Sequence, residues 1–101
     1  MKEIKLDDMT ITEVRSISLQ VIDLQSGETV SSANITHTPP SGSVLTIAKT
    51  ISTPYIYMLF GPFEVAGRHI VKVQAIGSAA SPSKPETIFY VDVVNVWAGR
   101  K

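Results

Sequence analysis

The chain has 101 residues, of which 44% are hydrophobic and 18% charged, a composition typical of one folded domain and unlike that of disordered chains. Nine basic and nine acidic side chains balance and are scattered along the chain, so its charge pattern does not favour binding to nucleic acid or to an anionic membrane. The absence of cysteine excludes disulfides, thiol nucleophiles and thiolate metal sites.

Residues 1–13 are predicted to form a weak first strand or an arm. Asp7 and Asp8 interrupt any apolar stretch there, so the segment does not have the pattern of a secretory signal, and we expect synthesis in the cytoplasm. The longest apolar run, residues 55–60, is far shorter than the roughly 20 residues of a membrane helix, and prolines flank it. We therefore expect no membrane span.

Alternating apolar and polar residues predict a series of strands after this first segment. The expected strands cover residues 14–23, 30–38, 43–50, 55–60, 68–76 and 87–94. The alternation assigns several side chains to a core, namely Ile17, Leu19, Val21, Ala33, Ile35, Val71, Val73 and Ala75. Turn chemistry separates the strands, at the Gly27 turn, at the Pro39 and Pro62 breaks and in the Ser/Pro-rich loop 77–86.

Together with the weak first strand, this makes about seven antiparallel strands, the pattern of an all-β sandwich of two sheets. The whole chain, 1–101, is expected to be one domain. Its core is expected within about 14–94, with residues 95–101 as a tail.

Residues 55–60 differ from the other strands because both of their faces are apolar. Such a strand is either central in a sheet or part of a contact surface. In one interpretation, Ile56, Met58 and Phe60 face the core while the tyrosines lie flat on the outer sheet. In the other, the surplus of apolar side chains forms an interaction surface, since aromatic residues are enriched at binding hot spots. Its candidate members are Tyr55, Tyr57, Leu59, Phe63 and Trp97.

The segment Ala66-Gly67-Arg68-His69-Ile70-Val71-Lys72-Val73-Gln74-Ala75 resembles the sixth strand of bacterial and phage immunoglobulin-like domains, where Gly-x-Tyr opens a valine-rich alternating strand. The resemblance covers roughly residues 14–94. It implies an immunoglobulin-like sandwich of the disulfide-free type. In that family the tyrosine hydroxyl ties the corner between the fifth and sixth strands. His69 stands at the tyrosine position here and is the candidate corner residue, since an imidazole can donate similarly.

No catalytic, cofactor or metal site is expected from the residues. His37 and His69, the only histidines, belong to no close cluster of His, Asp and Glu, and no nucleophile elbow or phosphate-binding glycine pattern is present. Asp7 and Asp8 are adjacent carboxylates in a polar segment rather than a pair facing across a cleft. The chain is therefore not expected to be an enzyme.

Two hypotheses of function follow, and a third needs a feature that is not visible in the residues. The first is a non-enzymatic immunoglobulin-like module, similar to the small accessory domains of phage virions, that binds a protein partner or associates with itself through sheet edges and the aromatic patch. The second is a carbohydrate-binding module in which Tyr55, Tyr57 or Trp97 stacks on a sugar beside Asn34 or Gln74. An enzyme of unrecognised type would need a deep pocket lined by titratable groups.

Overall fold

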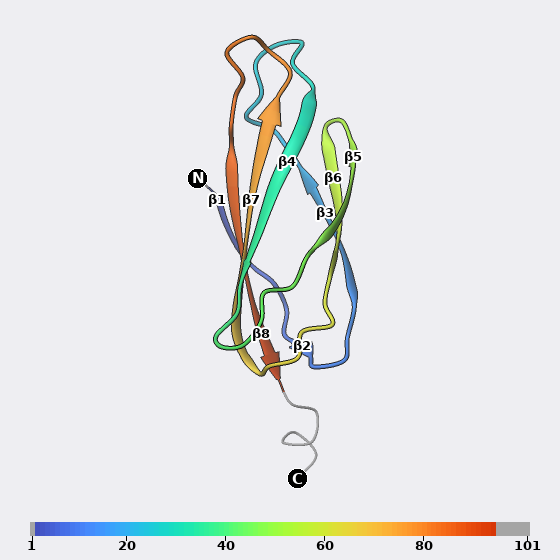
Figure 1. The fold of residues 1–101 in the computed structure, drawn as a ribbon. Helices are drawn as coiled ribbons and strands as arrows, with labels where there is room; N and C mark the ends of the chain where they lie inside the picture. The colour runs from blue at the N-terminus through green and yellow to red at the C-terminus, as the bar shows by residue number, and fades with distance from the viewer. Residues whose placement is uncertain (1, 95–101) are drawn as a thin grey trace.

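The computed structural model describes residues 2–94, and all regular structure in this range is β-strand. The strands are β1 (Lys2–Lys5), β2 (Met9–Thr10), β3 (Arg15–Gln20), β4 (Val30–Thr38), β5 (Ala48–Ser52), β6 (Tyr55–Phe60), β7 (Gly67–Gly77) and β8 (Glu86–Val94). They form one five-stranded and one three-stranded sheet, which lie face to face (Figure 1). The expected all-β architecture of two sheets is confirmed. Within residues 2–94 there is no helix of the length and apolar character needed to cross a membrane.

The larger sheet has the order β1-β8-β7-β4, with β2 also paired to β8, and the smaller sheet has the order β3-β6-β5. All pairs are antiparallel except those of β1 and β2, which run parallel to β8. The sequence led us to expect about seven strands, all antiparallel. Eight are found because the expected first strand is interrupted, and its two pieces lie along the last strand in the same direction.

Several contacts hold the N-terminal segment against the rest of the domain, although the core was expected only within residues 14–94. Met9 is fully buried in the core. The guanidinium of Arg15 donates to the carbonyl oxygens of Asp7 at 2.8 Å and Asp8 at 3.0 Å, and it pairs with the Glu13 carboxylate at 2.8 Å. The amide of Leu6 donates to the Tyr90 carbonyl at 2.8 Å. Residues 2–13 are thus part of the packed domain and not a detached arm.

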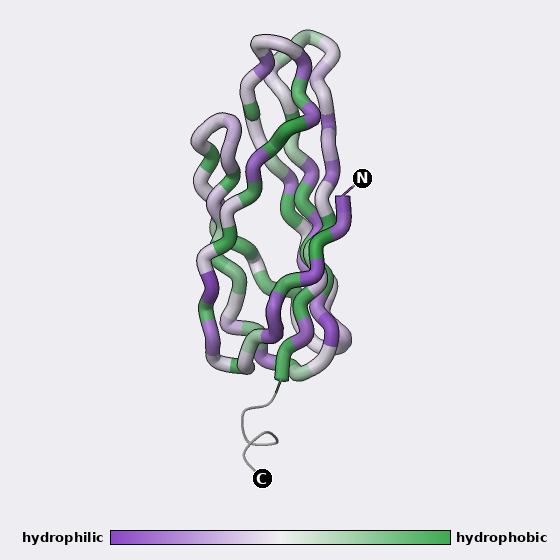
Figure 2. The backbone as a smooth tube through the Cα atoms, turned by 180° about the vertical axis from the view of Figure 1, so that it is seen from behind, coloured by the Kyte–Doolittle hydropathy of each residue, from purple (hydrophilic) through white to green (hydrophobic). Residues whose placement is uncertain are grey.

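The core lies between the two sheets and follows the predicted alternation. Along β6 every second side chain is buried, and the same holds over most of β7 and β8. Figure 2 shows the corresponding alternation of hydrophobic and hydrophilic residues along the strands. Leu19, Val21 and Ala33 are buried as predicted, while Ile17 and Ile35 are partly buried and pack against this core. Burial of the remaining predicted set, Val71, Val73 and Ala75, is likewise confirmed.

The strand expected at residues 43–50 begins only at Ala48, so its predicted start is wrong. The amide of Leu45 donates to the ring nitrogen Nδ1 of His37 at 2.8 Å instead of to a neighbouring strand. Residues 43–47 therefore form a loop over the end of β4. Ile47 is still buried, because the alternation continues through the loop although the sheet pairing does not.

Candidate functional site

The outer face of the three-stranded sheet carries a row of large apolar side chains. Tyr55, Tyr57 and Leu59 alternate along β6 with buried residues and are 37%, 45% and 47% exposed. β6 is the central strand of its sheet, so the row runs along the middle of the face. Ile56, Met58 and Phe60 fill the core on the other side. We call the Tyr55–Tyr57–Leu59 row and its neighbours on β3 and β5 the β6 face.

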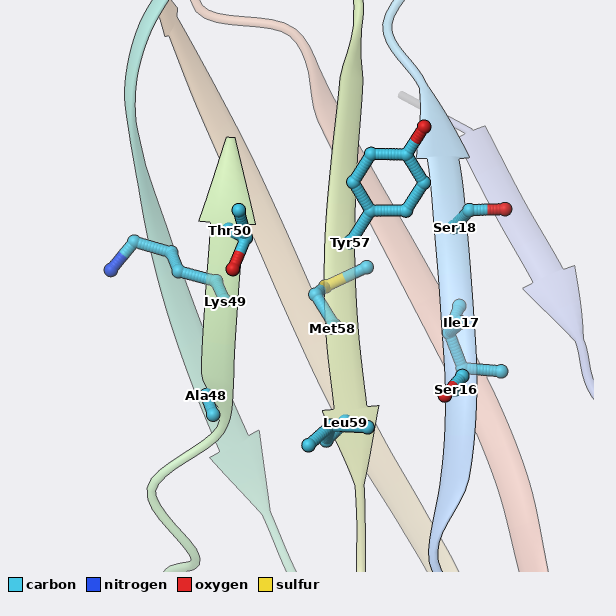
Figure 3. A pocket seen from close by; sticks show the side chains of 9 residues that line it. All are labelled: Ser16, Ile17, Ser18, Ala48, Lys49, Thr50, Tyr57, Met58 and Leu59. Carbon is cyan, nitrogen blue, oxygen red and sulfur yellow. The ribbon is translucent and has the colours of Figure 1, made fainter. Parts of the chain in front are cut away.

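Small residues flank this row on both neighbouring strands. Ser18 and Thr50 are the register partners of Tyr57, and Ser16 and Ala48 are those of Leu59. Their short side chains leave an open groove of about 360 Å³ above the sheet. In Figure 3 the ring of Tyr57 leans over the sheet towards β3, with its hydroxyl near Ser18. The groove is therefore apolar along its middle and bounded by hydroxyl groups.

The two free edges of this sheet are unequal. Lys49 of β5 has the buried Met58 as its register partner, yet its side chain is exposed and extends away from the sheet (Figure 3). A lysine on the inward side of an edge strand disfavours pairing with a further strand, because pairing would bury its charge. β3 carries no charge between Ser16 and Gln20. Contact through the face is thus better supported than contact through the β5 edge.

The five residues predicted to form one interaction surface do not all belong together. Tyr55, Tyr57 and Leu59 share the β6 face. Phe63 does not, and its assignment to the surface is wrong: it is 1% exposed and packs against the rings of His37 and His69, at centroid distances of 5.1 and 4.6 Å. It lies in the connection after β6, which folds back over the end of the core. Trp97 lies outside the described residues.

The polar residues expected beside the tyrosines lie on the other sheet. The side-chain amide of Asn34 donates to the Gln74 side-chain oxygen at 3.4 Å, and that of Gln74 donates to the Glu86 carboxylate at 3.4 Å. These residues are register neighbours across β4, β7 and β8. A sugar stacked on Tyr55 or Tyr57 would meet Ser18 and Thr50, not Asn34 or Gln74.

The candidate corner residue His69 is buried and hydrogen-bonded at both ring nitrogens. Its Nε2 lies 2.6 Å from the carbonyl oxygen of Val65, four residues earlier, and its Nδ1 lies 2.8 Å from Nε2 of His37. His37 is also buried, and burial, with a smaller contribution from the charge of His69, lowers the pKa of His37 below its ordinary value of 6.5.

The closeness of these two histidines was not predicted from the sequence. Each follows the alternation of its own strand, since His37 is two residues after Ile35 and His69 two residues before Val71. That spacing was a usable sign that both rings point inward. The two rings come together because of the register of β4 with β7. His37 is the partner of Val71, and His69 is two residues before Val71 in β7.

At the opposite end of the sandwich, Glu28 joins two connections, 21–29 and 78–85, which lie together in Figure 1. The Glu28 carboxylate accepts hydrogen bonds from the backbone amides of Gln25 at 2.9 Å, Ser83 at 3.0 Å and Ala79 at 3.3 Å. The sequence predicted only a turn at Gln25–Glu28. The contacts with Ala79 and Ser83 cross more than fifty positions of sequence and arise from the packing of the two loops.

The hydrogen bonds to Glu28 predict a specific loss of stability in acid. They hold the pKa of Glu28 at about 2, against an ordinary value of 4.5, with the bond from Gln25 as the largest cause. Because the pKa is lower in the folded state, the stabilisation is present above pH 4.5 and is lost as the pH falls towards 2. Between these values the melting temperature of the wild type is expected to fall more steeply than that of Glu28→Gln, measured by circular dichroism.

The matched control for this measurement is Glu3→Gln, which neutralises an exposed carboxylate on β1. Its profile is expected to follow the wild type. Equal slopes for the wild type and Glu28→Gln would show that the loop contacts of Glu28 do not favour its charged form.

Within residues 2–94, no group of three or more His, Cys, Asp or Glu side chains is arranged to hold a metal ion. Beside His37 and His69 there is a small cavity of about 150 Å³, covered by residues 39–45 and 62–65. Its lining combines the two imidazoles with proline, serine and apolar residues and one exposed carboxylate, Glu64.

No protein-family model matches this chain, and no curated protein matches it in sequence. Among solved structures, an endo-fucoidan hydrolase from glycoside hydrolase family 107 contains a region of similar fold, with a TM-score of 0.56 and 14% sequence identity over 94% of this chain. The chain spans 13% of the length of that protein. At this identity the similarity concerns the fold alone. The chain is thus a small all-β domain of two sheets that matches one region of a much larger hydrolase.

Proposed function

We propose that this chain is an immunoglobulin-like domain without catalytic activity, and that it associates with further copies of itself through the β6 face. The observation that carries the proposal is the row of three large apolar side chains, each 37% to 47% exposed, along the middle of one sheet. A contiguous row of exposed apolar side chains is typical of a protein contact surface.

The strand order supports the immunoglobulin-like type. If β1 and β2 together count as the first strand, the smaller sheet holds the second, fifth and fourth strands. The larger sheet then holds the third, sixth and seventh, with the first strand alongside the seventh. In immunoglobulin-like domains of the constant type, the first, second, fifth and fourth strands share one sheet, and the third, sixth and seventh share the other, so only the place of the first strand differs here.

The corner of the sandwich gives a second argument for this type. The carbonyl of Val65 can only accept a hydrogen bond, so Nε2 of His69 donates to it, and the link joins the start of β7 to the chain just before it. The tyrosine of an immunoglobulin-like corner makes a similar bond to the backbone a few residues upstream. His69 would therefore replace the tyrosine in function as well as in position.

Self-association through a face accounts for the composition of that face. Two copies related by a twofold axis would each present the same row, and Tyr57 and Leu59 would be buried together. The small neighbours Ser16, Ser18 and Ala48 allow close approach of a second sheet. The similarity of residues 66–75 to phage domains supports a place for such a unit in a virion or another multi-copy assembly.

The test is the molar mass in solution, measured by light scattering over roughly a tenfold range of protein concentration. The wild type is expected to have a mass above that of one chain, rising with concentration. Leu59→Lys is expected to have the mass of one chain throughout, because association would bury its charge.

Ile22→Lys is the matched control, since Ile22 is also a well exposed apolar residue but lies in the connection after β3, outside the groove. It is expected to associate as the wild type does. A wild type with the mass of one chain at every concentration would rule out self-association through this face. Equal loss of association in both lysine variants would show that charge, rather than the face, is responsible.

A specific feature of the β6 face favours carbohydrate binding as the second candidate. The rings of Tyr55 and Tyr57 lie 5.9 Å apart at an interplanar angle of 23°, so two nearly parallel aromatic surfaces stand beside the hydroxyls of Ser18 and Thr50. In this case the wild type would be monomeric. Added polysaccharides, fucoidan among them, would change the tyrosine fluorescence of the wild type but not that of Tyr57→Ser.

A further inference from the structure

The buried pair of His37 and His69 lies between the ends of β4 and β7, where two loops close the sandwich. The rings are parallel to within 6°, with their centroids 5.1 Å apart, and both side chains are almost completely buried. The loop 39–47 enters this end from β4, and the connection 61–66 enters it from β6. Each imidazole is hydrogen-bonded to the backbone of one of these segments, His37 to Leu45 and His69 to Val65.

The hydrogen-bond partners determine where the protons lie. Because the Val65 carbonyl only accepts, Nε2 of His69 carries a proton; because the Leu45 amide only donates, Nδ1 of His37 carries none. A neutral His37 then has its proton on Nε2, which donates to the bare Nδ1 of His69 at 2.8 Å. All three hydrogen bonds are therefore made when both rings are neutral, and they run in one direction from Leu45 to Val65.

One additional proton breaks this series of three hydrogen bonds wherever it binds. On Nδ1 of His37 it faces the amide proton of Leu45, so two donors oppose each other. On Nδ1 of His69 it faces the Nε2 proton of His37. These two protons no longer oppose each other only if His37 carries its proton on Nδ1 instead. The Nδ1 proton of His37 then opposes the amide proton of Leu45. The bond to Leu45 is the weak point because it joins the pair to a loop rather than to a paired strand.

We infer that the His37–His69 pair is an acid-operated latch, in which the uptake of one proton releases the loop 39–47 from the closed end of the sandwich while both sheets stay paired. Release of this loop would uncover Phe63, which packs against both rings, and would open the small cavity beside them. The latch is independent of the β6 face, since no residue is shared between the two sites.

Within residues 2–94, no ionisable side chain other than these two histidines is buried. Val71 lies opposite His37 in β7, and Val91 lies opposite His69 in β8. Among the residues of the two loops that line the cavity, Glu64 alone is ionisable, and it is exposed. Any charge on the pair is thus held beside apolar and serine side chains, with one solvated carboxylate on the rim.

The lowered pKa of His37 gives the direction of the effect. A histidine exposed to solvent by release of the loop has an ordinary pKa of about 6.5. In the closed state the pKa of His37 is lower because of burial, so below pH 6.5 the open state binds more protons than the closed state. Falling pH therefore favours opening, and the latch is closed above this value.

The experiment is amide hydrogen exchange measured by NMR between pH 7.5 and 5. The protection factor of the Leu45 amide is expected to be constant above pH 6.5 and to fall about tenfold per pH unit below it, as uptake of one proton requires. The internal reference is the Val21 amide, which donates to the Pro54 carbonyl at 2.7 Å, away from the histidines. Its protection is expected to stay constant over the same range.

His37→Asn tests the role of the titrating ring, because its carboxamide oxygen can accept the Leu45 bond but does not titrate. In this variant the pH dependence of Leu45 protection is expected to be weaker, because one of the two rings that can bind the additional proton is gone. The latch is ruled out if the wild-type Leu45 amide keeps its protection down to pH 5. It is also ruled out if Leu45 and Val21 lose protection together, which would mean unfolding of the whole domain. An undiminished dependence in His37→Asn would contradict the inference in the same way.

Discussion

Replacing Phe63 by alanine is expected to lower the free energy of unfolding by about 3–5 kcal/mol, the range found when a buried aromatic side chain is truncated. The side chain is 1% exposed and touches both imidazoles, so its removal leaves a cavity next to these two hydrogen-bonded rings. A domain of this size is typically stable by about 5–15 kcal/mol, so the expected loss is about a fifth or more of the total stability. Urea unfolding followed by circular dichroism measures the difference.

Tyr57→Ala is the matched control for this prediction, since it also truncates an aromatic residue that the sequence placed on the same surface. Tyr57 is half exposed, and its loss is expected to cost about 1 kcal/mol. Equal losses in the two variants would contradict the assignment of Phe63 to the core and Tyr57 to the outer face.

The second large effect is expected at Gly61, where alanine would lower the free energy of unfolding by about 3–4 kcal/mol. Gly61 has φ +100°, a conformation that side chains rarely adopt, and a Cβ there would overlap the backbone oxygen of Glu13. That oxygen belongs to the backbone leading from the N-terminal segment into β3 and cannot move aside as a flexible side chain would. Urea unfolding again gives the value.

Gly27→Ala separates the two causes of this effect. Gly27 has φ +77°, but a Cβ there would meet nothing within 4 Å, so only the backbone strain remains and about 1 kcal/mol is expected. If Gly61→Ala were no more harmful than Gly27→Ala, the close approach of Glu13 to the end of β6 would not contribute to stability.

Several parts of the fold could be predicted because they depend on neighbouring residues. The extent of β4 and β6 agrees with the prediction to the residue, since prolines or turn residues bound them and their alternation is regular. The burial of Ile56, Met58 and Phe60, with the tyrosines outside, was one of the two interpretations of the strand, and the structure confirms it. The partner of the exposed row stays a prediction.

Other parts could not be predicted, because the deciding contacts join distant segments. The alternation of residues 43–50 fits a strand, but the Leu45 amide finds its acceptor on His37, eight residues earlier, and the strand begins later. Phe63 and Tyr57 are similar aromatic residues, and only the return of the chain after β6 buries one and exposes the other. Glu28 has the local pattern of a turn residue, although it also bonds a loop more than fifty residues away.

The sequence by itself determined that this is an all-β domain, which residues of most strands face inward, and that β6 has two apolar faces. These properties follow from a period of two residues and from local turn chemistry, both of which can be read within a few positions. Only the tertiary structure decided the parallel course of β1 and β2 along β8, the burial of Phe63 and the meeting of His37 with His69. These depend on sheet order and strand register. Both are set by the packing of the whole core and cannot be predicted from any single segment of the sequence.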